Sequence, residues 1–263
     1  MKKSLDSKKI IHYMVLIALF SALSYLGTFI AIPVGISKVH LGNYICILAG
    51  LLCGGLVGGC SGAIGMGLND LTSSYGPDTI IRTVIVKFIV GFLAGFLFRL
   101  FIKKDIKVKW IFTVFLAIFL SLFVTFLTLY VKFGDSFQFM GRTFKNSIFL
   151  IVCLGIFTLL YLFSFIFSYL IKKEQQLVLL VASICGGVNV ILEFIIKIPF
   201  KMLFASMTFE QAYAYAITSL PGALFTTILT VVFVTLTFIP LYLATRKINR
   251  YNDLSFEDLS SKN

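Results

Sequence analysis

The sequence predicts an all-α integral membrane protein that crosses the bilayer eight times and keeps both ends in the cytoplasm. Three observations support this fold class. Hydrophobic residues make up 59% of the 263 residues and charged residues only 13%, whereas soluble domains are nearer half apolar and a quarter charged. The apolar residues form long runs, and the lysines and arginines cluster between those runs. Because such clusters orient membrane helices, the net charge of +12 does not indicate a nucleic-acid partner.

The first apolar run covers residues 10–32 and follows the basic segment MKKSLDSKK. It is too long for the hydrophobic region of a signal peptide, and it lacks a cleavage site of the small-x-small type. We therefore expect it to be retained as the first membrane span.

The glycine-rich tract at residues 40–72 decides the topology. As one helix it would be ~48 Å long, far more than the ~30 Å of a bilayer core. Glycines recur in it every four residues, and small residues at that spacing let helices pack closely within a membrane. These glycines are Gly54, Gly58 and Gly62. We expect two short spans, 40–54 and 55–72, with a turn between them.

The charge clusters support two crossings by this tract. Further apolar runs follow at residues 79–102, 110–131, 146–171, 177–200 and 215–245. The basic clusters are Lys2, Lys3, Lys8 and Lys9; Lys103, Lys104, Lys107 and Lys109; Lys172 and Lys173; and Arg246, Lys247 and Arg250. The positive-inside rule places all four clusters in the cytoplasm, which requires an even number of crossings between residues 40 and 72. The alternative, one overlong helix, would place the second cluster outside.

Ionisable residues inside membrane spans are costly and are therefore candidates for function. Lys87 lies about 12 Å deep in its span by the helical rise. Its own span contains no acidic residue, so Lys87 needs a carboxylate from another span or from a ligand. Asn189, Glu193 and Lys197 share one face of the span 177–200 because they are spaced by four residues. With Pro199 taken as the outer end of that span, Glu193 lies at a depth similar to that of Lys87.

Asn43 and Asp70 are expected near the same level, so the predicted substrate-binding residues are Asn43, Asp70, Lys87, Asn189, Glu193 and Lys197. Two structural alternatives remain for these charges. Glu193 and Lys197 can neutralise each other as an i,i+4 ion pair. Asp70 and Arg82 lie near the membrane surface and can extend into water.

No catalytic residue, metal site or cofactor is predicted. The chain has no P-loop, HExxH or GxSxG motif, so we expect neither ATP hydrolysis nor another enzymatic activity from it. The five cysteines lie in apolar segments without CxxC spacing, which favours buried thiols. The two histidines are too few and too far apart for a metal site.

Two stretches carry a resemblance to a known family. They are IPVGISKVHLGNYICILAGLLCGGLVGGCSGAIGMGLNDL and SSYGPDTIIRTVIVKFIVGFLAGF. Both are similar to the substrate-binding S components of energy-coupling-factor (ECF) vitamin transporters, most of all to the branch of riboflavin, hydroxymethylpyrimidine and pyridoxine carriers. The resemblance covers residues 10–102 and resumes weakly at 177–245, where SLPGALFTT is similar to the last helix of the family.

The resemblance implies a six-span core in a single membrane domain, 1–263, of the prokaryotic plasma membrane. The core spans would be 10–32, 40–54, 55–72, 79–102, 177–200 and 215–245. The hairpin 110–171, which is rich in phenylalanine and faces lipid, would be an insertion, and 246–263 a cytoplasmic tail.

The resemblance also implies a function. The chain would bind a vitamin-like small molecule from outside, under a lid formed by the loops 33–41 and 201–214. It would work with a transmembrane coupling subunit and two cytoplasmic ATPase subunits. Ala18 and Ala22 match a family AxxxA motif that packs against the coupling subunit, and small residues one turn apart form a flat strip suited to that role.

Two other functions remain open. A self-sufficient proton-coupled transporter would use Asp70, Lys87 and Glu193 as a proton relay. Such transporters often contain internal repeats, and no repeat is visible here. In a membrane scaffold, the buried charges would be structural pairs only.

Overall fold

The computed structural model describes most of the chain. The described residues are 7–34, 37–73, 75–104, 107–134, 136–139, 142–145 and 147–245. The tail 246–263, with the basic cluster from Arg246 to Arg250, lies outside them, as do Lys2 and Lys3.

The all-α class is confirmed, with two short antiparallel strand pairs that the sequence did not indicate. The helices are α1 (Ser7–Phe29), α2 (Gly42–Cys53), α3 (Gly55–Thr72), α4 (Pro77–Lys104), α5 (Val108–Phe133), α6 (Ser147–Phe167), α7 (Lys173–Phe204), α8 (Phe209–Thr218) and α9 (Leu220–Thr245). The strand pairs are β1 (Ala31–Val34) with β2 (Ser37–His40), and β3 (Ser136–Phe139) with β4 (Arg142–Lys145). Within the described residues, six helical segments are long and apolar enough to cross a membrane.

The glycine-rich tract folds back on itself at Gly54, where the sequence predicted a turn. Gly54 has a φ of 102°, a backbone conformation that glycine adopts without steric cost. Helices α2 and α3 then run antiparallel, so that a Cβ added to Gly58 would lie 2.5 Å from Cα of Gly50. The tract therefore forms two short helices in place of one overlong helix.

Helix α4 completes a three-helix contact with α2 and α3 that depends on glycine. A Cβ added to Gly95 would lie 2.6 Å from the carbonyl oxygen of Gly50, and one added to Gly59 would lie 2.8 Å from that of Phe88. Because the hydrophobic effect does not drive helices together in lipid, such close backbone packing is a main source of their association. This contact holds α4, which carries Lys87, against α2 and α3.

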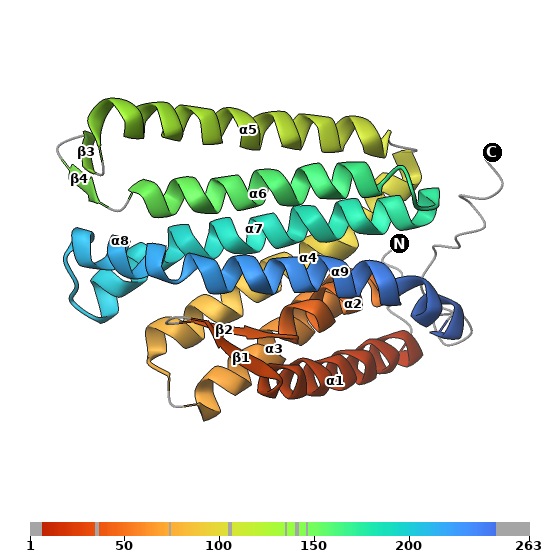
Figure 1. The fold of residues 1–263 in the computed structure, drawn as a ribbon. Coiled ribbons are helices and arrows are strands. Elements are labelled where there is room, and N and C mark those ends of the chain that lie inside the picture. The colour runs from red at the N-terminus through yellow and green to blue at the C-terminus, as the bar shows by residue number, and fades with distance from the viewer. Residues whose placement is uncertain are drawn as a thin grey trace, which may run out of the picture.

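The α5–α6 hairpin lies on the outside of the bundle, where Figure 1 shows α5 as the outermost helix. Only 6% of the apolar window of α5 is buried. Phe119 of α5 stacks on Phe157 and Tyr161 of α6. The Tyr161 hydroxyl donates to the carbonyl oxygen of Ser183 at 3.0 Å, which ties the hairpin to α7.

The described basic clusters share one end of the molecule. Figure 1 shows that α1, α5 and α7 begin at this end and that α4 and α9 finish there, whereas α8 and the β3–β4 pair lie at the opposite end. We call it the basic end, and its lysines are Lys8, Lys9, Lys103, Lys104, Lys107, Lys109, Lys172 and Lys173. If an even number of membrane crossings separates each pair of consecutive clusters, all of the clusters must lie at the same end, as the described ones do here.

We predict that the basic end is cytoplasmic, because positive residues stay inside. A cysteine at Lys107, which is exposed, should react with a membrane-impermeant maleimide only after the membrane has been opened. Ala205→Cys, exposed at the opposite end, should react in intact cells. Both variants are made in a background without the native cysteines. Labelling of Lys107→Cys in intact cells would show that the orientation is wrong.

Several boundaries differ from the sequence prediction. The first span, predicted as 10–32, ends as a helix at Phe29 and is followed by β1. Pro199 does not end its helix, because α7 continues through it to Phe204. Proline removes one backbone donor, and neighbouring helices can compensate for this within a membrane bundle. The segment 201–214, predicted as a loop, is largely helical, since α8 begins at Phe209 with a capping box formed by Thr208 and Gln211.

Candidate functional site

A cavity of about 510 Å³ lies in the half of the bundle away from the basic end. Its lining comes from α1–α4, α7–α9, the β1–β2 pair and the connections between them. No described lining residue belongs to α5 or α6. The volume falls within the range of 300–1,000 Å³ that is typical of small-molecule sites.

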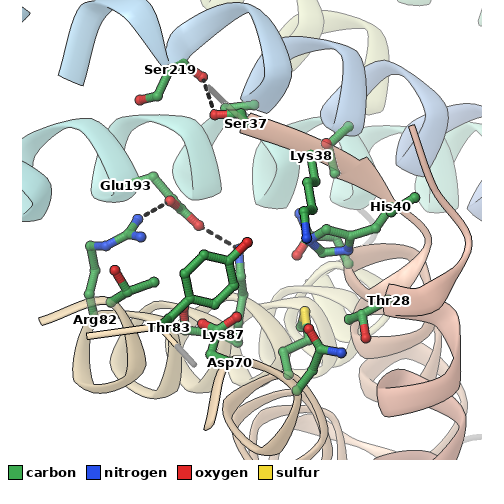
Figure 2. Close-up of a pocket in the computed structure, with 18 of the residues that line it drawn as sticks. Thr28, Ser37, Lys38, His40, Asp70, Arg82, Thr83, Lys87, Glu193 and Ser219 are labelled. Carbon is green, nitrogen blue, oxygen red and sulfur yellow. Dashed lines mark hydrogen bonds and ion pairs between the residues drawn. The ribbon is translucent and has the colours of Figure 1, made fainter. Parts of the chain in front are cut away.

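One carboxylate of the cavity lining pairs with two cations of α4. Glu193 of α7 accepts from Lys87 Nζ at 2.7 Å through Oε1 and pairs with Arg82 Nη1 through Oε2. Lys87 also donates to Asn189 Oδ1 at 2.7 Å. Figure 2 shows Glu193 between Arg82 and Lys87. Lys87 thus receives from another span the carboxylate that the sequence required for it.

The i,i+4 ion pair between Glu193 and Lys197 is not the arrangement found. Glu193 faces the two cations of α4, whereas Lys197 Nζ donates to Ser219 Oγ at 2.6 Å, where α8 gives way to α9. The side chains of residues four apart on a helix point in directions that differ by about 40°. This difference is enough for Glu193 to face α4 and for Lys197 to face Ser219. Arg82 does not extend into water either, since it is only 9% exposed.

All six residues predicted to bind substrate line this one cavity. They are Asn43, Asp70, Lys87, Asn189, Glu193 and Lys197. Asn43 is 5% exposed, and its Oδ1 atom has no hydrogen-bond partner within the described residues. Asp70 lies beside Thr83 and Lys87, as Figure 2 shows. Their role in binding stays a prediction.

The β1–β2 pair covers part of the cavity and brings a histidine into it. Ser37 Oγ donates to the carbonyl oxygen of Ser219 at 3.2 Å, which joins the strand pair to the start of α9. His40 Nδ1 accepts from the backbone N–H of Gly42 at 3.2 Å. Burial, and then the nearby Lys87 ammonium, lowers the pKa of His40 to about 4. The imidazole is therefore neutral at pH 7 and carries its proton on Nε2.

Several lining residues were not among those predicted from the sequence. They are chiefly Arg82, Ser37, Lys38, His40, Tyr215, Ser219 and Thr226. The sequence did contain a signal for Arg82, because a charged residue within an apolar run is a candidate for function. Ser219, Ala223 and Thr226 share a helix face, but hydroxyl residues are common in membrane helices. Thr226 donates to the carbonyl oxygen of Gly222 in its own helix. Threonines in membrane helices commonly make this bond, so nothing in the sequence assigned Thr226 to a site.

Ala18 and Ala22 lie away from the cavity. Both are exposed on α1, and neither lines the cavity. Nearby apolar residues of the same helix, including Met14 and Leu26, are also exposed. The strip is thus accessible, and its role in docking stays a prediction.

The family comparison agrees with the architecture. A family model described as "ECF-type riboflavin transporter, S component" matches residues 8–172. Neither a curated protein nor a solved structure matches the chain. The matched residues include the hairpin 110–171 and end before α7, so the assignment of that hairpin as an insertion stays a prediction. Because the match spans more than half of the chain, and six helical segments of the described residues are long and apolar enough to cross a membrane, the chain belongs to the S components of ECF transporters, the multi-pass cell-membrane subunits that bind the substrate.

Proposed function

We propose that this chain binds a vitamin or a vitamin precursor from outside the cell and delivers it through an ATP-driven coupling module. The cavity of about 510 Å³ at the end away from the basic clusters carries this proposal. With the basic end in the cytoplasm, the cavity opens toward the exterior. Its polar groups come from seven helices and a strand pair, as expected of a site that recognises a small polar molecule.

The partners follow from the family. An S component works with a transmembrane coupling subunit and two cytoplasmic ATPase subunits, which would hydrolyse ATP while this chain supplies the site. Proton relay by Glu193, as in a self-sufficient transporter, is disfavoured because its carboxylate is held by Lys87 and Arg82.

The direct test is ligand binding by the full chain, purified in lipid nanodiscs without ATP. Riboflavin is the first compound to test, because the matching family is described by it, and the other B vitamins and their precursors follow. We expect at least one to bind with a Kd below 1 μM, about −8 kcal/mol. Absence of binding across the panel, or ATPase-independent uptake in cells that lack coupling subunits, would contradict the proposal.

Lys87→Ala is expected to weaken binding of that ligand by about 1–3 kcal/mol, the usual cost of leaving buried polar partners unsatisfied. The lysine is 4% exposed and holds both Asn189 and Glu193. Isothermal titration of the variant against the wild type measures the loss. Lys132→Ala, at an exposed position on α5, is the control and should bind normally. Equal affinity of Lys87→Ala and the wild type would remove Lys87 from the site.

Ala18→Trp and Ala22→Trp are each expected to abolish assembly with the coupling subunits and to leave ligand affinity intact. A tryptophan would protrude from the small-residue strip that the docking role requires. Co-purification with the coupling module measures assembly. Ile118→Trp, at a position 47% exposed on α5, is the control for a bulky residue elsewhere on the lipid-facing surface. Normal assembly of both alanine variants would exclude this docking face.

A further inference from the structure

The cavity contains more positive than negative side chains. Its charged lining residues are Lys38, Arg82, Lys87 and Lys197 against Asp70 and Glu193. Lys38 is exposed on β2, where water can solvate its ammonium group. The other three cations are buried, with at most 9% of each residue exposed. Three buried cations therefore face two carboxylates.

The two carboxylates are associated with α4. Glu193 pairs with both Arg82 and Lys87. Asp70 lies near the same two cations and beside Thr83. The remaining buried cation of the lining, Lys197, is attracted by Glu193 one turn away, but it forms no direct ion pair among the described residues, and Glu193 is already shared by two other cations.

Lys197 is held in place by a neutral group. Its Nζ donates to Ser219 Oγ at 2.6 Å, and Ser219 Oγ in turn donates to the carbonyl oxygen of Ala216 at 2.7 Å. Because the serine proton is used in this way, Ser219 acts toward the lysine only as an acceptor. An ammonium group has three N–H donors, so two are not used by Ser219. The Tyr215 ring, whose centroid lies 6.0 Å from Nζ, is a second neutral neighbour in the lining. The lysine one turn further along α7 differs: Lys201 is neutralised by Asp78 at 2.6 Å and does not line the cavity.

A buried cation without a direct ion-pair partner is costly within a membrane protein, and here three buried cations share two carboxylates. We propose that the substrate supplies the missing charge: it is an anion whose carboxylate or phosphate group binds Lys197. This inference rests on the proposed function and narrows it to one chemical class. The unpartnered Oδ1 of Asn43, buried in the lining, adds a second requirement, an N–H or O–H donor on the same ligand.

Matched neutral and anionic compounds test the charge requirement directly. The probes are riboflavin with riboflavin 5′-phosphate, pyridoxal with pyridoxal 5′-phosphate, and nicotinamide with nicotinate, titrated into the full chain in nanodiscs. We expect the anion of the recognised pair to bind about 10-fold more tightly than its neutral partner, or better, as a charge-assisted hydrogen bond allows. A neutral partner that binds equally well or more tightly would overturn the inference but leave the proposed function standing. Failure of every probe and of the wider vitamin panel would overturn the proposed function itself.

Lys197→Met tests whether Lys197 is the residue that causes the preference for the anion. It should weaken binding of the anion more than binding of the neutral partner, so that the preference for the anion falls to less than about 3-fold, because the charge-assisted contact is lost. Lys197→Arg should keep most of the preference, and Lys132→Met, on the exposed surface of α5, should keep all of it. An equal loss for both partners in Lys197→Met would show a structural role and overturn the assignment. If that variant does not fold, the wild-type comparison of the pairs still decides the inference.

Discussion

Glu193→Gln is expected to destabilise the protein by about 3 kcal/mol, the lower end of the range for a buried ion pair, because the Glu193 side chain is 18% exposed while its partners are buried. The variant should also lose substrate binding, because both cations are left without their carboxylate. Here the loss affects two cations at once, since the same carboxylate holds Arg82 and Lys87. Glutamine retains the shape of the side chain and one acceptor oxygen. The substitution therefore isolates the contribution of the negative charge.

The transition temperature of the purified variant, measured by intrinsic fluorescence in nanodiscs, reports the stability loss, and titration with the recognised vitamin reports binding. Glu210→Gln is the matched control, because Glu210 is exposed at the start of α8 and should tolerate the change. Wild-type stability and affinity in Glu193→Gln would show that the α4–α7 ion-pair network contributes neither to the fold nor to the site.

Gly95→Ala is expected to cost about 3 kcal/mol, the upper part of the usual range for overpacking. The added methyl group would contact the backbone nitrogen of Gly55 and lie 2.6 Å from both the carbonyl oxygen of Gly50 and the carbonyl carbon of Gly54. These are backbone atoms at the turn between α2 and α3, so no side chain can rotate away to make room. The helices themselves must separate, which would also displace Lys87 on α4.

Size-exclusion chromatography and thermal aggregation of the variant measure this effect. Gly155→Ala in α6 is the control, because the three atoms nearest to its methyl group all belong to the side chain of Phe123, the closest at 3.2 Å. Alanine is the better helix former by about 0.5–1 kcal/mol, so Gly155→Ala should be neutral or mildly stabilising. Equal behaviour of the two variants would show that the three-helix contact of α2, α3 and α4 does not depend on glycine.

The local patterns of the sequence were enough for the class of the fold and for its long helices, but not for the two strand pairs or for α8. Apolar runs and basic clusters specify membrane helices and the ends that they share, because both signals depend on the cost of transferring each residue into lipid. The turn at Gly54 was predictable for a similar reason, since one helix through residues 40–72 would exceed the bilayer thickness. The depth of Lys87 indicated that a carboxylate must come from another span.

The identity of each partner was decided by the tertiary structure. Glu193 and Lys197 are spaced for an ion pair on α7, yet the rotation of that helix directs one toward α4 and the other toward Ser219. The sequence left open whether Arg82 extends into water at the membrane surface. In the structure, Arg82 lines the cavity and forms an ion pair with Glu193. The β1–β2 pair brings His40 into the lining through contacts with residues far along the chain.

The sequence by itself determined which long segments are apolar enough to cross a membrane, because hydropathy and charge act residue by residue. The tertiary structure alone decided which residues of those segments meet. Each pairing depends on the rotation and register of two packed helices, and close backbone contacts such as the one at Gly95 set that geometry. The buried cation at Lys197, which forms no direct ion pair among the described residues, follows from that packing.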